Sequence, residues 1–177
     1  RTAKWGMYKN YRLIVENSTI TDLNKNNQFH FFDAGSRSLA TYITIKNNTF
    51  NNITGDIFRL NKEADDLGIY NADYLTMDNN TFTNIDSALV NLYRGGSDES
   101  TFGPHLIFTN NTIDNVGKDM KWNKAKSSIK VHGVQVSTIS DNNFKDSAIV
   151  TVEHTVGEPI TTIQNNKFNN TPAPIIV

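Results

Sequence analysis

The feature that most constrains this sequence is a motif that repeats along its whole length. Two polar residues, usually Asn-Asn, are followed two positions later by one large apolar residue, as in the stretch NNTFTNIDSALVNL that begins at Asn79. A fixed period of this kind is typical of a solenoid, in which each repeat stacks on the next. The equivalent apolar positions are separated by 30, 32, 31, 31 and 24 residues, and they are Ile20, Phe50, Phe82, Ile113, Phe144 and Phe168.

Short runs of alternating apolar residues precede the asparagine pairs. TYITIKNN, DYLTMDNN and HLIFTNN are examples, and β-branched or aromatic residues occupy every second position. An alternation of two is the period of a strand, whereas a helical repeat would place apolar residues three and four positions apart. A second apolar run, such as DIFRL or AIVTV, often follows the asparagine pair. The sequence predicts an all-β fold: a right-handed single-stranded parallel β-helix of about six turns, each built as strand, corner, strand.

The asparagines fit such a solenoid at its corners. Asparagine tolerates the left-handed backbone angles of a tight bend. When similar turns stack, asparagine amides at equivalent corners can bond to the turns above and below. The same stacking predicts that the large apolar residues form an internal aromatic column. Its members are Phe50, Phe82, Phe144 and Phe168.

Composition narrows the class of protein and of partner. The 177 residues fit one β-helix domain, residues 1–177, and the net charge of −1 argues against nucleic acid or a membrane surface as the main partner. No apolar run approaches the length of a membrane span, and there are no cysteines. Neither end of the repeat array shows an evident cap, so we expect the chain to be part of something larger, or to be covered at its ends by other segments.

Polar groups are densest in YRGGSDESTFGPH, the loop from Tyr93 to His105. An arginine can hold a carboxylate with two parallel hydrogen bonds, a tyrosine can stack on a sugar ring, and paired glycines allow a ligand close to the backbone. The alternative is that Arg94 pairs inside the loop with Asp98 or Glu99. The candidate ligand-binding residues of this loop are Tyr93, Arg94, Asp98, Glu99 and His105.

Three other groups of residues are weaker candidates. Trp122 lies in KDMKWNKAK, an insertion whose lysines favour an anionic polymer, although an ordinary solvated loop would look the same. Lys130 and His132 alternate on one strand, so we expect them on one face; they are weak catalytic candidates. The carboxylate pairs Asp65-Asp66 and Asp98-Glu99 lack the spacing of a calcium loop, so the sequence predicts no metal site.

Three stretches together carry a resemblance to a known family. They are the Asn-Asn-Thr-Phe turns, the segment NKEADDLGIYNADYLTMDNNTF, and LYRGGSDESTFGPH. The sequence resembles the C-terminal region of the alginate lyase and chondroitinase B family, polysaccharide lyase family 6. The likeness is clear from about Asn47 to Val116 and weaker elsewhere.

That resemblance implies a right-handed parallel β-helix placed after a catalytic one. It also implies β-elimination on a uronate polysaccharide, with a lysine base, an arginine acid and calcium, all in the N-terminal helix. No stretch here matches those motifs, so we expect neither catalytic residues nor a cofactor in this chain, and calcium in the N-terminal domain. The expected partners are an alginate-like anionic polysaccharide and that catalytic domain, in the periplasm or outside the cell.

The resemblance favours an accessory role in shaping the substrate cleft or in domain and dimer packing. We also expect the Tyr93–Pro104 loop to face the catalytic helix. Two alternatives stay open. One is a non-catalytic carbohydrate-binding or structural β-solenoid. The other is a self-contained lyase or glycosidase, which would need a complete acid and base set on one face.

Overall fold

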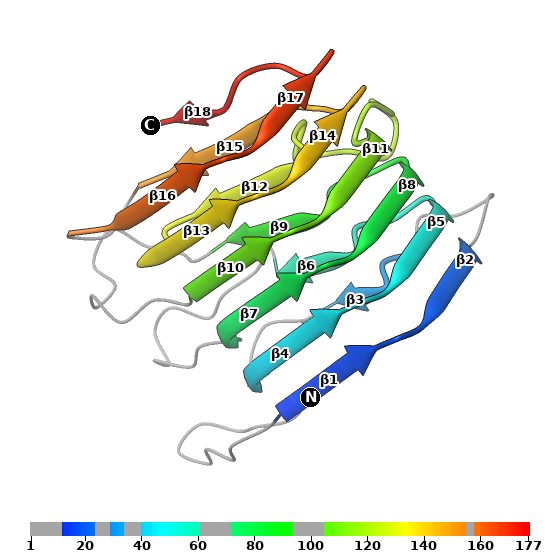
Figure 1. Cartoon of the computed structure of the whole chain (residues 1–177), viewed down its shortest axis with the longest axis horizontal. Coiled ribbons are helices and arrows are strands. Elements are labelled where there is room, and N and C mark those ends of the chain that lie inside the picture. The colour runs from blue at the N-terminus through cyan, green and yellow to red at the C-terminus, as the bar shows by residue number, and fades with distance from the viewer. Residues whose placement is uncertain (1–11, 24–28, 34–39, 61–71, 94–104, 155–157) are drawn as a thin grey trace.

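The computed structural model describes residues 12–23, 29–33, 40–60, 72–93, 105–154 and 158–177. Its strands form three parallel sheets of six strands each (Figure 1). The first sheet contains β1 (Arg12–Glu16), β4 (Ala40–Lys46), β7 (Ala72–Asp78), β10 (His105–Thr109), β13 (Val136–Ser140) and β16 (Ile160–Gln164). The second contains β2 (Thr19–Leu23), β5 (Thr49–Ile53), β8 (Thr81–Ile85), β11 (Thr112–Val116), β14 (Asn143–Lys145) and β17 (Lys167–Asn169). The third contains β3 (Phe32–Asp33), β6 (Phe58–Leu60), β9 (Val90–Tyr93), β12 (Ile129–His132), β15 (Val150–Glu153) and β18 (Ile175–Ile176).

Consecutive strands belong to consecutive sheets, so three strands make one turn and six turns stack along one axis. This is a parallel β-helix of six turns, and the predicted fold is confirmed. The predicted alignment of the repeats is confirmed as well, because Ile20, Phe50, Phe82, Ile113, Phe144 and Phe168 pair in register across the second sheet.

The number of strands in a turn differs from the prediction, which was two. The residues just after the asparagine pair form a strand of their own, as β5 and β8 show. In β5, Phe50 and Ile53 both point inward although they lie three positions apart, because Asn52 between them has a left-handed φ of 60°. This bend hides the strand from a search for simple alternation.

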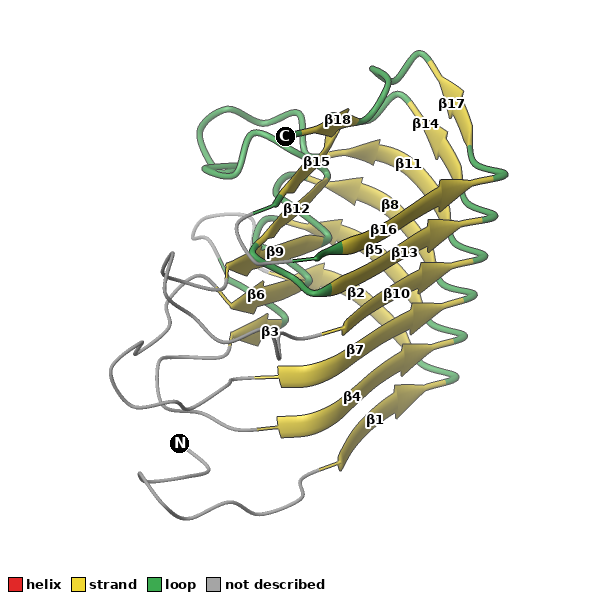
Figure 2. Cartoon of the chain, turned by 90° about the vertical axis from the view of Figure 1, so that its left-hand side faces the viewer, coloured by secondary structure: helices red, strands yellow, loops and turns green. Residues whose placement is uncertain are grey.

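The corner between the first and second sheets, here called the first corner, has two residues in every turn. Its first residue has a φ between 52° and 60° in all six turns: Asn17, Asn47, Asn79, Asn110, Asp141 and Asn165. Figure 2 shows these corners in one column, as the green loops that join the two sheets. The expected left-handed role of asparagine is confirmed.

The second residue of the first corner builds a buried amide ladder. The Oδ1 of Asn111 accepts the backbone N–H of Asn80 at 2.8 Å and its side-chain N–H at 3.1 Å. Asn111 donates in turn to Asn142 Oδ1 (3.1 Å) and to the carbonyl oxygen of Met77 (2.9 Å). The same pattern links Asn48 to Asn80 and Asn142 to Asn166. The ladder thus satisfies buried backbone groups across the stacked turns.

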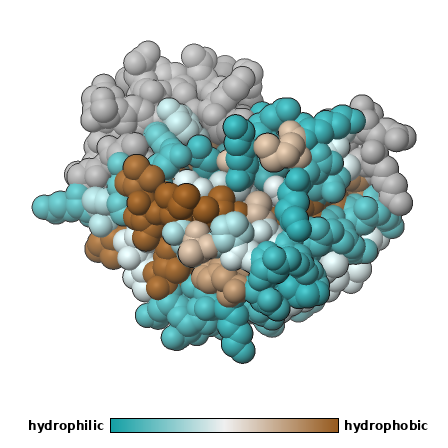
Figure 3. Space-filling model, turned by 90° about the horizontal axis from the view of Figure 1, so that it is seen from above, coloured by the Kyte–Doolittle hydropathy of each residue, from teal (hydrophilic) through white to brown (hydrophobic). Residues whose placement is uncertain are grey.

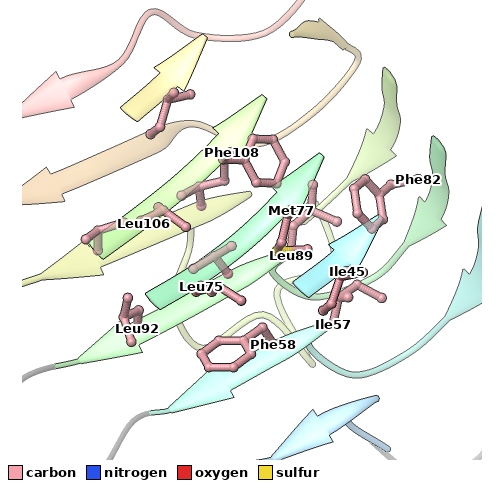
Figure 4. Close-up of a cluster of buried hydrophobic side chains, with 14 of the residues drawn as sticks. Ile45, Ile57, Phe58, Leu75, Met77, Phe82, Leu89, Leu92, Leu106 and Phe108 are labelled. Carbon is pink, nitrogen blue, oxygen red and sulfur yellow. The ribbon is translucent and has the colours of Figure 1, made fainter. Parts of the chain in front are cut away.

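The aromatic column occupies the interior. Figure 4 shows Phe82 of this column, with Phe108, among the buried side chains. Phe50 stacks on Phe82 with ring centroids 5.2 Å apart, and Phe144 stacks on Phe168 at 5.0 Å. Ile113 interrupts the column between them, and Phe108 from the first sheet fills the gap, 6.3 Å from both Phe82 and Phe144. Phe50, Phe82 and Phe144 are fully buried. Phe168 also packs inward but is only half-buried, because it belongs to the last turn.

The end of the solenoid that carries the last turn exposes apolar side chains. Figure 3 shows hydrophobic surface gathered on this end, seen from above. The exposed large apolar residues of the last turn are Ile160, Ile175, Ile176 and Val177.

Candidate functional site

The outward face of the third sheet brings together three of the predicted residues. Lys130 and His132 lie on one face of β12, as expected from their alternation, and Tyr93 pairs in register with His132. The Tyr93 and His132 rings stack with centroids 4.4 Å apart. Glu153 on β15 lies 3.1 Å from Lys130 Nζ and 3.8 Å from His132 Nε2.

In this cluster, the side chains on the outside of the third sheet are paired with one another through the Glu153 carboxylate. Lys130 Nζ forms an ion pair with the Glu153 carboxylate at 3.1 Å. Lys130 and His132 also share one carboxylate, that of Glu153. The arrangement suits a rigid polar surface.

His105 lies on another sheet. It begins β10, in register with Tyr74, and its ring meets the Tyr74 ring edge-on at 4.6 Å. Tyr74 stacks in turn on Tyr42 at 5.0 Å, so His105 ends an aromatic row on the outside of the first sheet. Arg94, Asp98 and Glu99 lie outside the described residues, as do Asp65 and Asp66.

Trp122 lies at the corner between the second and third sheets, here called the second corner. This corner has four residues in turns two, three and five (54–57, 86–89 and 146–149), whereas turn four has residues 117–128. The longer loop is visible beside β11 in Figure 1. Asn123, which is 1% exposed, holds the loop by donating to the Ser127 carbonyl oxygen at 3.0 Å and to that of Gly117. The side chain of Lys121 covers the Trp122 ring, with Nζ 4.2 Å from the centroid.

A pocket of about 110 Å³ lies beneath this loop, along the second corner and the adjoining face of the third sheet. Trp122 and Lys124 of the loop line it together with Arg59 of β6. The remaining lining residues are polar and come from turns one to three: His30, Asp56, Ser87 and Asn91. With a neutral His30, two cations and one carboxylate give the lining a net charge of about +1.

The only carboxylate of this lining, Asp56, is already occupied. It is 3% exposed and accepts hydrogen bonds from the Ser87 hydroxyl, from Ala88 N (3.0 Å) and from Asn91 Nδ2 (3.3 Å). A carboxylate with this many donors is satisfied by the protein itself. The charges of Arg59 and Lys124 therefore favour an anionic ligand in the pocket.

Arg59 has more donors than acceptors around it. Its Nε is buried and has no hydrogen-bond partner among the described residues, and the Asp33 carboxylate is 3.8 Å away. Its Nη1 contacts His30 Nε2, while the other ring nitrogen of His30 accepts the Asp56 N–H at 2.9 Å. A neutral imidazole accepts at one ring nitrogen only, so Arg59 and the Asp56 N–H compete for His30.

His30 is held in its neutral form by its surroundings. Burial lowers the pKa of His30 below its ordinary value of about 6.5. The Asp56 carboxylate opposes this change, and the Arg59 charge adds to it. The pocket thus keeps its positive charge on Arg59 and Lys124, while the imidazole acts through hydrogen bonds.

Sequence reasoning found Trp122 but missed its neighbours in the pocket. Arg59, Asn91 and Lys130 occupy one register row across β6, β9 and β12. The row was hidden because the insertion lengthens the spacing within it from 32 to 39 residues. The row becomes visible only when β6, β9 and β12 are aligned by their strand pairing and the outward residues at the same register position are compared.

In the part of the chain that the structure describes, no cluster of three or more His, Asp or Glu side chains could hold a metal ion. In the same ranges, no helix is long and apolar enough to cross a membrane.

Comparison with known proteins agrees with this architecture. The family model described as "Right handed beta helix region" matches residues 6–168, so the chain belongs to the right-handed β-helix proteins. Among solved structures, it is similar to the PL6 family alginate lyase AlyGC, with 47% identity, a TM-score of 0.88 and 96% of this chain covered. A single-residue variant of that enzyme matches with 48% identity, a TM-score of 0.88 and 99% of this chain covered. No curated protein matches the chain.

The match covers only part of the lyase. The chain spans 23% of the length of AlyGC and 24% of that of the variant, and it corresponds to the C-terminal region. The predicted resemblance to the C-terminal β-helix of a family 6 polysaccharide lyase is confirmed.

Proposed function

We propose that this chain is the accessory C-terminal β-helix of a polysaccharide lyase that acts by β-elimination on an alginate-like polymer of uronates. The observation that carries the proposal is the 47% identity to an alginate lyase over 96% of the chain. Its role is to complete the substrate cleft or to pack the domains, and its place is outside the cell or in the periplasm. The cleavage itself belongs to a separate catalytic β-helix.

The surfaces of the chain support this division of roles. Lys130 and His132 share Glu153, an arrangement suited to a rigid surface. The pocket at the second corner carries a surplus of positive charge, which suits a polymer with one carboxylate on each sugar.

The decisive experiment uses the coding region upstream of residue 1. We expect it to encode a catalytic β-helix, and we expect the longer protein to convert alginate into unsaturated uronate products, measured by their absorbance. Removal of residues 1–177 should then lower turnover. The isolated chain should produce no unsaturated uronate from alginate or chondroitin. Robust turnover by the isolated chain, or an upstream region unrelated to lyases, would overturn the proposal.

The loop from Tyr93 to Pro104 offers a sharper test of the cleft role. Arg94 is its best candidate for a contact with a uronate carboxylate. Arg94→Ala in the longer protein should lower turnover by roughly tenfold or more while the melting temperature stays unchanged. Earlier melting with full activity per folded molecule would assign Arg94 to the loop itself.

A further inference from the structure

We propose that the pocket at the second corner is a binding site for one carboxylated sugar residue, held through its carboxylate by Arg59 and Lys124. The proposal rests on the proposed function for the identity of the polymer. The lining of the pocket does not include Lys130 or His132, the weak catalytic candidates of the sequence. It is built from four successive turns and would be lost in a chain without the 117–128 loop.

The charge of the pocket selects an anion. Asp56 is engaged by three donors of the protein, whereas Arg59 keeps a buried Nε without an acceptor in the described residues. A carboxylate that enters beside Arg59 would supply acceptors and end the competition between Arg59 and the Asp56 N–H for His30. Lys124 is exposed and forms no ion pair with another described residue, so its ammonium group can join the same carboxylate.

The walls of the pocket fit a sugar better than a bare anion. Trp122 lines the pocket, and Lys121 lies over one face of its ring. The other face of the indole would offer an amphipathic surface, which suits a ligand with both apolar and polar parts. Asn91 lines the pocket from β9 and can exchange hydrogen bonds with ring hydroxyls. The combination of an arginine, a lysine, an indole and an amide matches a uronate: one carboxylate, several hydroxyls and a C–H face.

The size of the pocket limits how much of a polymer it can hold. Its volume of about 110 Å³ lies below the roughly 300 Å³ at which pockets begin to enclose whole drug-sized ligands. One carboxylate and part of its ring would therefore enter, while neighbouring sugars lie outside. We accordingly expect affinity to depend on the carboxylate and to change little with chain length beyond a few sugars.

The test is a titration of the complete 177-residue chain with a uronate trisaccharide prepared from alginate. The same trisaccharide with its carboxylates reduced to alcohols serves as the neutral control. Binding is followed by calorimetry and by Trp122 fluorescence in a Trp5→Phe background. We expect the acidic trisaccharide to bind and the reduced one to bind at least about tenfold more weakly, as for the loss of a charge-assisted hydrogen bond.

Variants locate the site. Arg59→Gln should weaken binding roughly tenfold or more, Arg59→Lys should restore part of that loss, and Lys124→Ala should cost about threefold. Trp122→Ala should weaken binding while leaving the melting temperature unchanged. Lys167→Ala on β17 is the matched control, because it removes an exposed lysine outside the pocket and should leave binding unchanged.

The outcomes separate the pocket from the proposed function. Wild-type binding that survives Arg59→Gln, Lys124→Ala and Trp122→Ala would overturn the pocket and leave the lyase proposal standing. If Lys167→Ala weakened binding of the acidic trisaccharide as much as Arg59→Gln does, the binding would depend only on the overall charge, and the pocket proposal would fail. It would also fail if the wild-type chain did not bind the trisaccharide at all. A chain that binds through the pocket but has no lyase domain upstream would be a carbohydrate-binding module, and only the lyase proposal would fail.

Discussion

The two corners of each turn differ in how much they vary. The first corner has two residues in all six turns, and its buried asparagines repeat the same hydrogen bonds from turn to turn. The second corner has four residues in three of the turns and residues 117–128 in turn four, where the pocket lies. Uniform geometry thus occurs where the turns are held together, and variation occurs where a site is built.

The difference has an energetic basis. A ladder asparagine has partners in the turns on either side. Loss of the Asn111 side chain would leave buried groups of the preceding turn, such as the Asn80 N–H and the Met77 carbonyl oxygen, without their partner. Of the side chains that the second corner adds in turn four, Lys121 and Lys124 are exposed, whereas Asn123 is buried and donates only within the loop, to the Gly117 and Ser127 carbonyl oxygens. The molecule can therefore gain a binding surface at the second corner at little expense to the stacking of its turns.

The largest loss of stability is expected in the interior that both corners enclose. Phe82 is fully buried and contacts Phe50 and Phe108 at ring-centroid distances of 5.2 and 6.3 Å. Phe82→Ala should lower the free energy of unfolding by about 3–5 kcal/mol, as for other large buried aromatics. Urea denaturation followed by circular dichroism measures this change. A loss below about 1 kcal/mol would contradict the interior position of the ring.

Next in size is the removal of one ladder amide. Asn111→Ala should lower the free energy of unfolding by about 3 kcal/mol, because the Asn80 amide and the Met77 carbonyl lose buried partners. The matched control is Asn110→Gly at the neighbouring exposed position, where a φ of 57° suits glycine. If both variants unfold at the same denaturant concentration, the first corner does not hold the turns in the way described.

A smaller effect is expected when the second corner of turn four is shortened. Replacing residues 117–128 with residues 86–89 of turn three should change the free energy of unfolding by only about 1 kcal/mol, since loop length alone contributes little. Binding of the acidic trisaccharide should disappear, because Trp122 and Lys124 are removed. A protein that no longer folds would show that the second corner also supports the stack.

The smallest effect concerns pH and His30. The folded protein holds the pKa of His30 below about 6.5, so the unfolded chain binds this proton more readily. Stability should therefore decline as pH falls from about 6.5 toward the lower pKa of the folded state, and the decline should be weaker in His30→Asn. Thermal melting between neutral and mildly acidic pH measures it. An identical decline in the variant would remove His30 from the explanation.

Most of the fold could be predicted from the sequence because its determinants are local. The asparagine pairs, the alternating runs before them and the inward phenylalanines each fall within a few residues, and their spacing repeats. The strand just after each asparagine pair, which belongs to the second sheet, was missed because a left-handed residue such as Asn52 breaks the alternation. Phe108 was missed as a member of the aromatic column because it reaches the column from another sheet.

The candidate site was less accessible to sequence reasoning. Trp122 and its lysines were visible because they are adjacent in the chain. His30, Asp56 and Arg59 come from earlier turns, and only the stacking places them beneath residue 122. The burial of Asp56 and the surplus donors of Arg59 are properties of the assembled turns, so no local motif could have indicated them.

The amide ladder has a further consequence for how a molecule of this kind can change in length. Each ladder asparagine accepts hydrogen bonds through its Oδ1 from the turn before it and donates through its N–H groups to the turn after it, so every turn presents the same two complementary edges. One whole turn can therefore be duplicated or deleted between equivalent asparagines, such as Asn80 and Asn111, and the joined surfaces still match. During evolution, a β-helix of this kind can therefore be lengthened or shortened by one whole turn at a time. A new binding surface can arise at the second corner of one turn, while the neighbouring turns keep their original outward side chains.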